Sequence, residues 1–142
     1  MNNLVLVDTN ILIYAIDADS QFHERALKFL SNDTLRFFTT SKNISEFLVV
    51  LTRNEEIDLS SAECLEILNS LLANVTVLYP NPTTFKVFQD LVRKYNPRDL
   101  WVHDIEIASI GVPSQAVCKF TCGVPFRAIT DLGCLTFLSR LC

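Results

Sequence analysis

Three acidic residues occupy positions where carboxylates can take part in catalysis. Asp8 follows the apolar run Leu4–Val7, Glu46 lies inside a predicted helix, and Asp104 stands near the start of another predicted helix. Each also has an ordinary structural interpretation. Asp8 can cap the helix that follows it, Glu46 can lie on a solvated helix face, and Asp104 can favour the positive end of its helix dipole.

Several carboxylates that converge in one cleft repel one another unless a cation neutralises them. Mg²⁺ and Mn²⁺ suit that role because they prefer oxygen ligands and retain bound water. Such an ion activates water and polarises a phosphoryl oxygen, which is the chemistry of metal-dependent nucleases. A phosphatase with a nucleophilic strand-end aspartate is the weaker alternative, because its usual second aspartate is replaced here by Asn10.

The elements that must position these acids alternate between strands and helices. Apolar periodicity and capping residues predict strands over Leu4–Val7, Leu35–Thr40 and Val75–Leu78, and helices over Asn10–Ile16, Gln21–Leu30, Ser41–Thr52, Ser61–Leu72, Thr83–Tyr95 and Trp101–Ile110. Two further strands are predicted loosely, near Val117–Thr121 and Leu135–Phe137. This alternation predicts an α/β domain with a mostly parallel sheet. Ligands bind such sheets at the carboxyl ends of the strands.

The order and spacing of the motifs resemble those of the PIN domain family, and within it the VapC-type toxins of bacterial toxin–antitoxin pairs. The matching pieces are Val7-Asp8-Thr9-Asn10, Ser45-Glu46-Phe47 and Trp101-Val102-His103-Asp104. The resemblance extends over residues 4–110. It implies a three-layer α/β/α sandwich around a central sheet and a ribonuclease that depends on Mg²⁺ or Mn²⁺.

The resemblance also implies roles for individual residues. Asp8, Glu46 and Asp104 fall on the acidic positions that hold the metal and support catalysis, and Thr9 and Asn10 fall on supporting positions. It further implies RNA as the substrate, an antitoxin protein as a partner, and a homodimer.

The last acidic motif of the family is degraded in this sequence. Phe126 falls close to the expected phenylalanine, so the preceding acid position is Pro125, within an atypical segment, residues 112–125. This segment fits true divergence or a pair of compensating frameshifts, and Asp131 is a further candidate ligand from a shifted loop. The alternative function is therefore a catalytically impaired PIN fold that binds an antitoxin or RNA without cutting it.

Composition limits the remaining possibilities. The 142 residues suit a single domain, 1–142, and the net charge of -4 argues against RNA binding by bulk positive charge. The sequence shows no apolar run long enough to span a membrane and no signal-peptide pattern. Five cysteines cannot all pair within one chain, so reduced thiols and a soluble, cytoplasmic protein are expected.

Two groups of side chains keep two interpretations each. The scattered basic residues can guide RNA phosphates or lie on a solvated face: Lys42, Arg53, Arg93, Lys94 and Arg98. Four apolar residues at helical spacing can belong to the core or to a dimer or antitoxin interface: Phe22, Phe29, Phe47 and Leu51.

Overall fold

A computed structural model of the chain describes residues 3–54, 58–114 and 117–119. Its sheet has the strand order β3-β2-β1-β4, and every neighbouring pair is parallel. The strands are β1 (Leu4–Val7), β2 (Arg36–Thr40), β3 (Val75–Leu78) and β4 (Val117–Lys119). The predicted parallel sheet is therefore confirmed. The strand predicted over Leu135–Phe137 and the last two residues of Val117–Thr121 lie outside the described residues.

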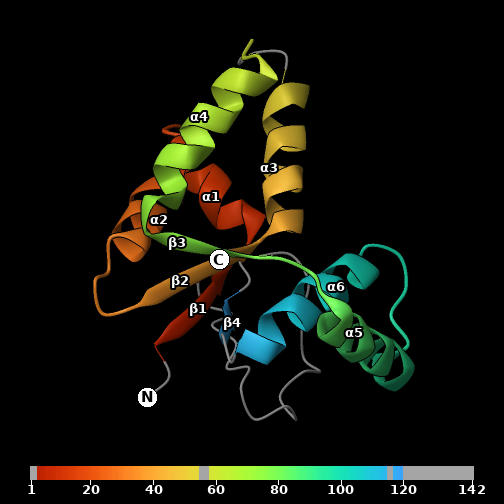
Figure 1. The fold of residues 1–142 in the computed structure, drawn as a ribbon. Coiled ribbons are helices and arrows are strands. Elements are labelled where there is room, and N and C mark those ends of the chain that lie inside the picture. Colours follow the sequence, from red (N-terminus) through yellow and green to blue (C-terminus); the bar gives the residue numbers. More distant parts are fainter. Residues whose placement is uncertain (1–2, 55–57, 115–116, 120–142) are drawn as a thin grey trace.

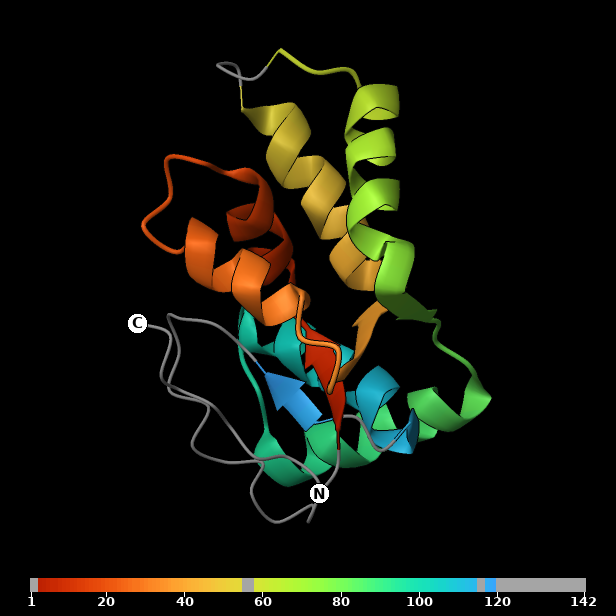
Figure 2. The same ribbon diagram turned by 90° about the vertical axis from the view of Figure 1, so that its left-hand side faces the viewer.

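Six α-helices and two short 3₁₀ turns complete the described fold. The helices are α1 (Thr9–Ile16), α2 (His23–Leu30), α3 (Ser41–Arg53), α4 (Ser61–Leu71), α5 (Pro82–Tyr95) and α6 (Trp101–Gly111), and the 3₁₀ turns are η1 (Leu72–Asn74) and η2 (Val112–Ser114). Helices α1 to α4 cover one face of the sheet and α5 and α6 cover the other (Figures 1 and 2). The three-layer α/β/α sandwich expected from the sequence is confirmed.

Strand β1 is apolar without interruption because both of its faces are buried. Val5 and Val7 belong to the core on the side of α1 to α4, whereas Leu6 packs with Leu91 and Ile105 on the side of α5 and α6. Successive side chains of a strand point to opposite faces of the sheet. A strand covered by helices on both sides therefore needs apolar residues at every position.

The helix ends follow from local capping chemistry. Ser60 and Glu63 form a capping box, in which each side chain accepts from the backbone N–H of the other residue. Helix α3 is capped by Thr40, whose hydroxyl accepts from the N–H of Asn43. Helix α5 ends at Asn96 in the left-handed conformation (φ 45°), which asparagine tolerates better than most residues.

The four apolar residues with two interpretations belong largely to the core. Phe47 is fully buried, Leu51 is 3% exposed, and Phe29 packs edge-on against Phe37 with ring centroids 5.2 Å apart. Phe22 is half-buried and its ring lies 4.9 Å from that of Tyr14. These side chains therefore pack against other residues of the same chain.

Apolar side chains reach the surface on helices α3 and α4. Val49 and Val50 on α3 and Leu65 on α4 are between 43% and 46% exposed. None of the helices in the described part of the chain has the length and apolar character that crossing a membrane requires.

Phe47 offers a direct test of this core. Phe47→Ala should lower the free energy of unfolding by about 3–5 kcal/mol, because it leaves a cavity between α3 and its neighbours. Urea denaturation followed by circular dichroism measures this change. Val50→Ala, on the exposed side of the same helix, is the control and should cost less than about 1 kcal/mol. Equal losses in the two variants would contradict the assignment of Phe47 to the core.

Candidate active site

Asp8 stands where strand β1 ends and helix α1 begins. Asp8 is the N-cap residue of α1, but its carboxylate makes no capping hydrogen bond. The Asp8 Oδ2 atom instead accepts from Asn10 Nδ2 at 3.3 Å. The Asp8 carboxylate lies at the carboxyl end of a central parallel strand, where ligands bind such sheets.

Glu46 reaches the same place from helix α3. Thr9 Oγ1 donates to Glu46 Oε2 at 3.0 Å and lies 3.3 Å from the backbone oxygen of Asn43. Thr9 is itself buried, and Glu46 is half-buried. Glu46 is thus connected to the residue after Asp8, and the simple solvated-face interpretation does not describe it.

The electrostatics show that Asp8, Glu46 and Asp104 share one region. Burial raises the pKa of Asp8 from 3.8 to about 6, and the negative charges of Glu46 and Asp104 add to this shift. Backbone N–H groups of Thr9 and Asn10 oppose it by favouring the charged carboxylate. Two acids, one on α3 and one on α6, therefore act on Asp8 at one edge of the sheet.

Asp104 occupies the first turn of helix α6, on the opposite layer from Glu46. Burial raises the pKa of Asp104, the charge of Glu46 raises it further, and neighbouring His103 lowers it. A carboxylate that served only the helix dipole would be stabilised in its charged form. The raised pKa indicates that repulsion and burial dominate at this position.

A buried polar network that the sequence analysis did not single out lies beneath these acids. Asn43 is fully buried, its Nδ2 atom donates to the Val7 carbonyl at 2.9 Å, and its Oδ1 atom accepts from Thr40 Oγ1 at 2.8 Å. Thr39 Oγ1 donates to the same Val7 carbonyl at 3.0 Å. The signal in the sequence was an asparagine four residues before Phe47, on the face of the helix that faces the core.

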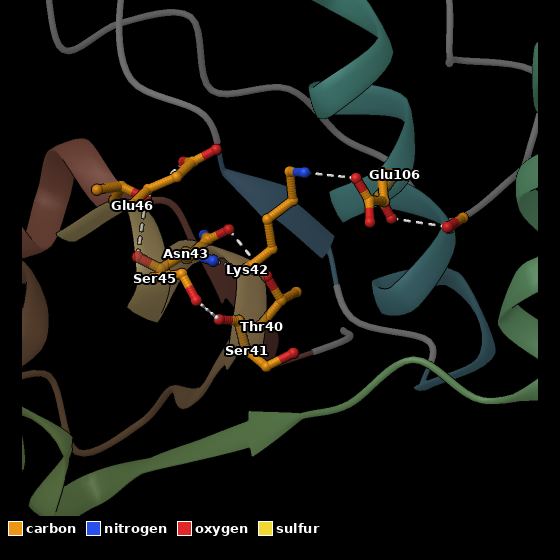
Figure 3. Close-up of polar contacts among 9 residues, drawn as sticks. Thr40, Ser41, Lys42, Asn43, Ser45, Glu46 and Glu106 are labelled. Carbon is orange, nitrogen blue, oxygen red and sulfur yellow. Dashed lines mark hydrogen bonds and ion pairs between the residues drawn. The ribbon is translucent and has the colours of Figure 1, made fainter. Parts of the chain in front are cut away.

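Lys42 is not a free cation for RNA in this arrangement. Its Nζ atom forms an ion pair with Glu106 Oε2, and the two side chains are 22% and 41% exposed (Figure 3). The pair connects α3, which carries Glu46, to α6, which carries Asp104. Glu106 is therefore a second residue that the sequence analysis left without a role.

The three carboxylates fit a hard divalent cation by donor type and charge. They supply oxygen ligands, and two of them have pKa values raised by burial and, in addition, by negative neighbours, whose repulsion a cation would relieve. Within residues 3–54, 58–114 and 117–119, however, no three His, Cys, Asp or Glu side chains are arranged so that they could hold an ion as they stand. Pro125 and the candidate ligand Asp131 lie outside the described residues.

The raised pKa of Asp8 makes a prediction about stability in the metal-free protein. The folded state holds the Asp8 proton more tightly than the unfolded chain, so ionisation of Asp8 destabilises the fold as the pH rises from about 4 to about 6. Asp8→Asn removes this titration and should raise the free energy of unfolding at pH 7 by about 1–3 kcal/mol. Urea denaturation with a chelator present, at several pH values, measures the difference.

The difference in the free energy of unfolding between Asp8→Asn and the natural protein should disappear below about pH 4. There Asp8 is protonated in both the folded and the unfolded state. Asp90→Asn is the matched control, because the Asp90 carboxylate is 64% exposed and pairs with Arg93 on the surface of α5. A variant Asp8→Asn that is less stable than the natural protein at pH 7 would contradict the burial and repulsion assigned to Asp8.

Solved structures share this fold. VapBC2 from Rickettsia felis, bound to a DNA fragment from its promoter, has a TM-score of 0.65 and 14% identity, covering 94% of this chain and 96% of that chain. VapBC-1 from nontypeable Haemophilus influenzae has a TM-score of 0.61 and 18% identity, covering 94% of this chain and 95% of that chain. VapC20 from Mycobacterium tuberculosis is described as a toxin that cleaves the sarcin–ricin loop. It has a TM-score of 0.60 and 14% identity, covering 92% of this chain and 96% of that chain.

No curated protein sequence matches the chain. The model of the PIN domain family, in contrast, matches residues 5–108. The match includes Asp8, Glu46 and Asp104 and spans well over half of the 142 residues. The resemblance found in the sequence is therefore confirmed, and the chain belongs to the PIN domain family.

Proposed function

We propose that the protein is an endoribonuclease that depends on Mg²⁺ or Mn²⁺ and is the toxin of a type II toxin–antitoxin pair. The observation that carries this proposal is that Glu46 and Asp104 approach Asp8 at the carboxyl end of β1, where burial and the charges of these two acids raise the pKa of Asp8. Family membership and the fold shared with VapBC complexes and a VapC toxin support it. RNA phosphodiester bonds are the proposed substrate.

Asp8, Glu46 and Asp104 would hold the cation, and Thr9 and Asn10 would support them. A bound Mg²⁺ or Mn²⁺ ion supplies an activated water and stabilises charge on a phosphoryl oxygen. Thr9 fixes the Glu46 carboxylate by donating to Oε2, and Asn10 donates to the Asp8 carboxylate. Each of these donors leaves other carboxylate lone pairs available, since an ionised carboxylate offers about four acceptor sites.

The proposal includes protein partners. Structures with this fold include VapBC proteins and a toxin–antitoxin complex from Klebsiella pneumoniae, so we propose an antitoxin partner for this chain. We also propose a homodimer, which the family resemblance implies. The net charge of -4 gives no general attraction to RNA, and Lys42 is already paired with Glu106. Recognition of RNA would therefore rest on local contacts and shape more than on overall charge.

A second candidate function is a PIN fold that binds an antitoxin or RNA without cutting. Two observations favour it. The sequence places Pro125 where the family has its last acid, and the acids of the described part do not enclose an ion as they stand. With one carboxylate fewer, the site would hold a cation more weakly and a two-metal mechanism would be harder to build.

Calorimetric titration with Mn²⁺ separates the two candidates. The natural protein should bind Mn²⁺, and Asp8→Asn should remove detectable binding because it deletes a charged oxygen ligand from the centre of the acidic group. Asp90→Asn removes an exposed carboxylate from α5 and should bind as the natural protein does. Absence of binding in the natural protein would overturn the metal-dependent nuclease and leave the binding module.

Cleavage of total bacterial RNA in the presence of Mn²⁺ tests the last acidic position. If the ribonuclease is active but weakened, Pro125→Asp should increase the cleavage rate, because it restores a carboxylate at the position that the family resemblance identifies. Asp8→Asn should abolish cleavage in both backgrounds. Cleavage that survives Asp8→Asn would contradict the assigned site, and no gain from Pro125→Asp would indicate that the change in residues 112–125 extends beyond one residue.

A further inference from the structure

Asn43 connects the strand that leads to Asp8 with the helix that carries Glu46. Its side chain is fully buried, and its Nδ2 atom donates at 2.9 Å to the carbonyl of Val7, the last residue of β1. Its backbone oxygen is also within 3.3 Å of the Thr9 hydroxyl, which donates to Glu46 Oε2 at 3.0 Å. The turn of α3 from Asn43 to Glu46 is thereby joined to the Val7–Thr9 segment at three points.

We infer that Asn43 is a positioning residue that holds Glu46 in fixed relation to Asp8. Glu46 lies three residues after Asn43, so the two side chains belong to adjacent positions on one turn of α3. Glu46 and Asp8 carry like charges that repel each other across the gap between α3 and β1. The hydrogen bond from the Asn43 side chain to the Val7 carbonyl opposes the movement of α3 that would relieve this repulsion.

The chemistry of the amide group suits this position. An amide donates through its nitrogen and accepts through its oxygen, and Asn43 does both, to the Val7 carbonyl and from Thr40 Oγ1. An ionised aspartate could not donate to the carbonyl, and an alanine would leave the buried Thr40 hydroxyl without this acceptor. Thr40 in turn caps α3 by accepting from the Asn43 N–H at 3.2 Å, so the same pair fixes the start of the helix.

The simpler interpretation is that Asn43 only satisfies buried polar groups and so contributes stability alone. Thr39 allows the two interpretations to be separated. Thr39 is also fully buried and donates to the same Val7 carbonyl at 3.0 Å, but it belongs to β2 and not to the helix that carries Glu46. Thr39→Val therefore removes one hydrogen bond from the same acceptor while leaving α3 connected to β1.

The inference rests on the proposed function, because it assumes that Asp8 and Glu46 act together on a cation. The test compares Asn43→Ala with Thr39→Val by Mn²⁺ calorimetry, together with crystal structures of the metal-free variants. Asn43→Ala should weaken Mn²⁺ binding roughly 10- to 100-fold, as loss of a supporting contact does at other metal sites, and Thr39→Val should leave it unchanged. Equal effects of the two variants, or no effect of either, would overturn the positioning role.

The crystal structures decide the question independently of metal binding. In Asn43→Ala the Thr9 Oγ1–Glu46 Oε2 contact, 3.0 Å in the natural protein, should be lost, and in Thr39→Val it should persist. If the natural protein binds no Mn²⁺, the metal part of the proposed function fails, while this comparison still tests the inference. A Thr9–Glu46 contact that persists in Asn43→Ala would overturn it.

Should Asn43→Ala fail to fold, Thr40 provides a milder pair of variants. Thr40→Ser keeps the hydroxyl that donates to Asn43 Oδ1 and caps α3, whereas Thr40→Val removes it. Thr40→Val should lose the Thr9–Glu46 contact and weaken Mn²⁺ binding, and Thr40→Ser should retain both. Retention of the contact in Thr40→Val would count against the inference.

Discussion

The hydrogen bonds that converge on the Val7 carbonyl are the constraint on which the candidate site depends. Val7 is the last residue of the strand at the centre of the described sheet, and its oxygen accepts from Thr39 on β2 and Asn43 on α3. Both donors are fully buried, where an unpaired polar group is costly. The end of β1 is therefore fixed to the neighbouring strand and helix, and the position of Asp8 follows from it.

This arrangement brings together like charges that would otherwise separate. Asp8 approaches from β1, Glu46 from the helices on one face of the sheet, and Asp104 from the helices on the other. Burial and mutual repulsion raise the pKa values of Asp8 and Asp104. The fold thus holds several carboxylates close together at one edge of the sheet, although they repel one another. A bound divalent cation would neutralise this repulsion.

The two helical layers are also connected directly. The ion pair between Lys42 on α3 and Glu106 on α6 joins the elements that carry Glu46 and Asp104 (Figure 3). A half-exposed ion pair of this kind contributes little to stability on its own. Its consequence for the site is that Lys42, a basic residue close to Glu46 in sequence, has its charge engaged within the protein and is not free to attract RNA.

The sequence by itself predicted the strands and helices from local patterns, and the order and spacing of its motifs singled out the three acids as candidates. An apolar run such as Leu4–Val7 predicts a doubly covered strand, and the spacing of Ser60 and Glu63 predicts a helix start. Only the tertiary structure showed that Asn43 belongs under the site and that Glu106 pairs with Lys42. Those contacts join residues 36 and 64 positions apart, and no local pattern in the sequence specifies which distant partner a buried amide or a lysine will meet.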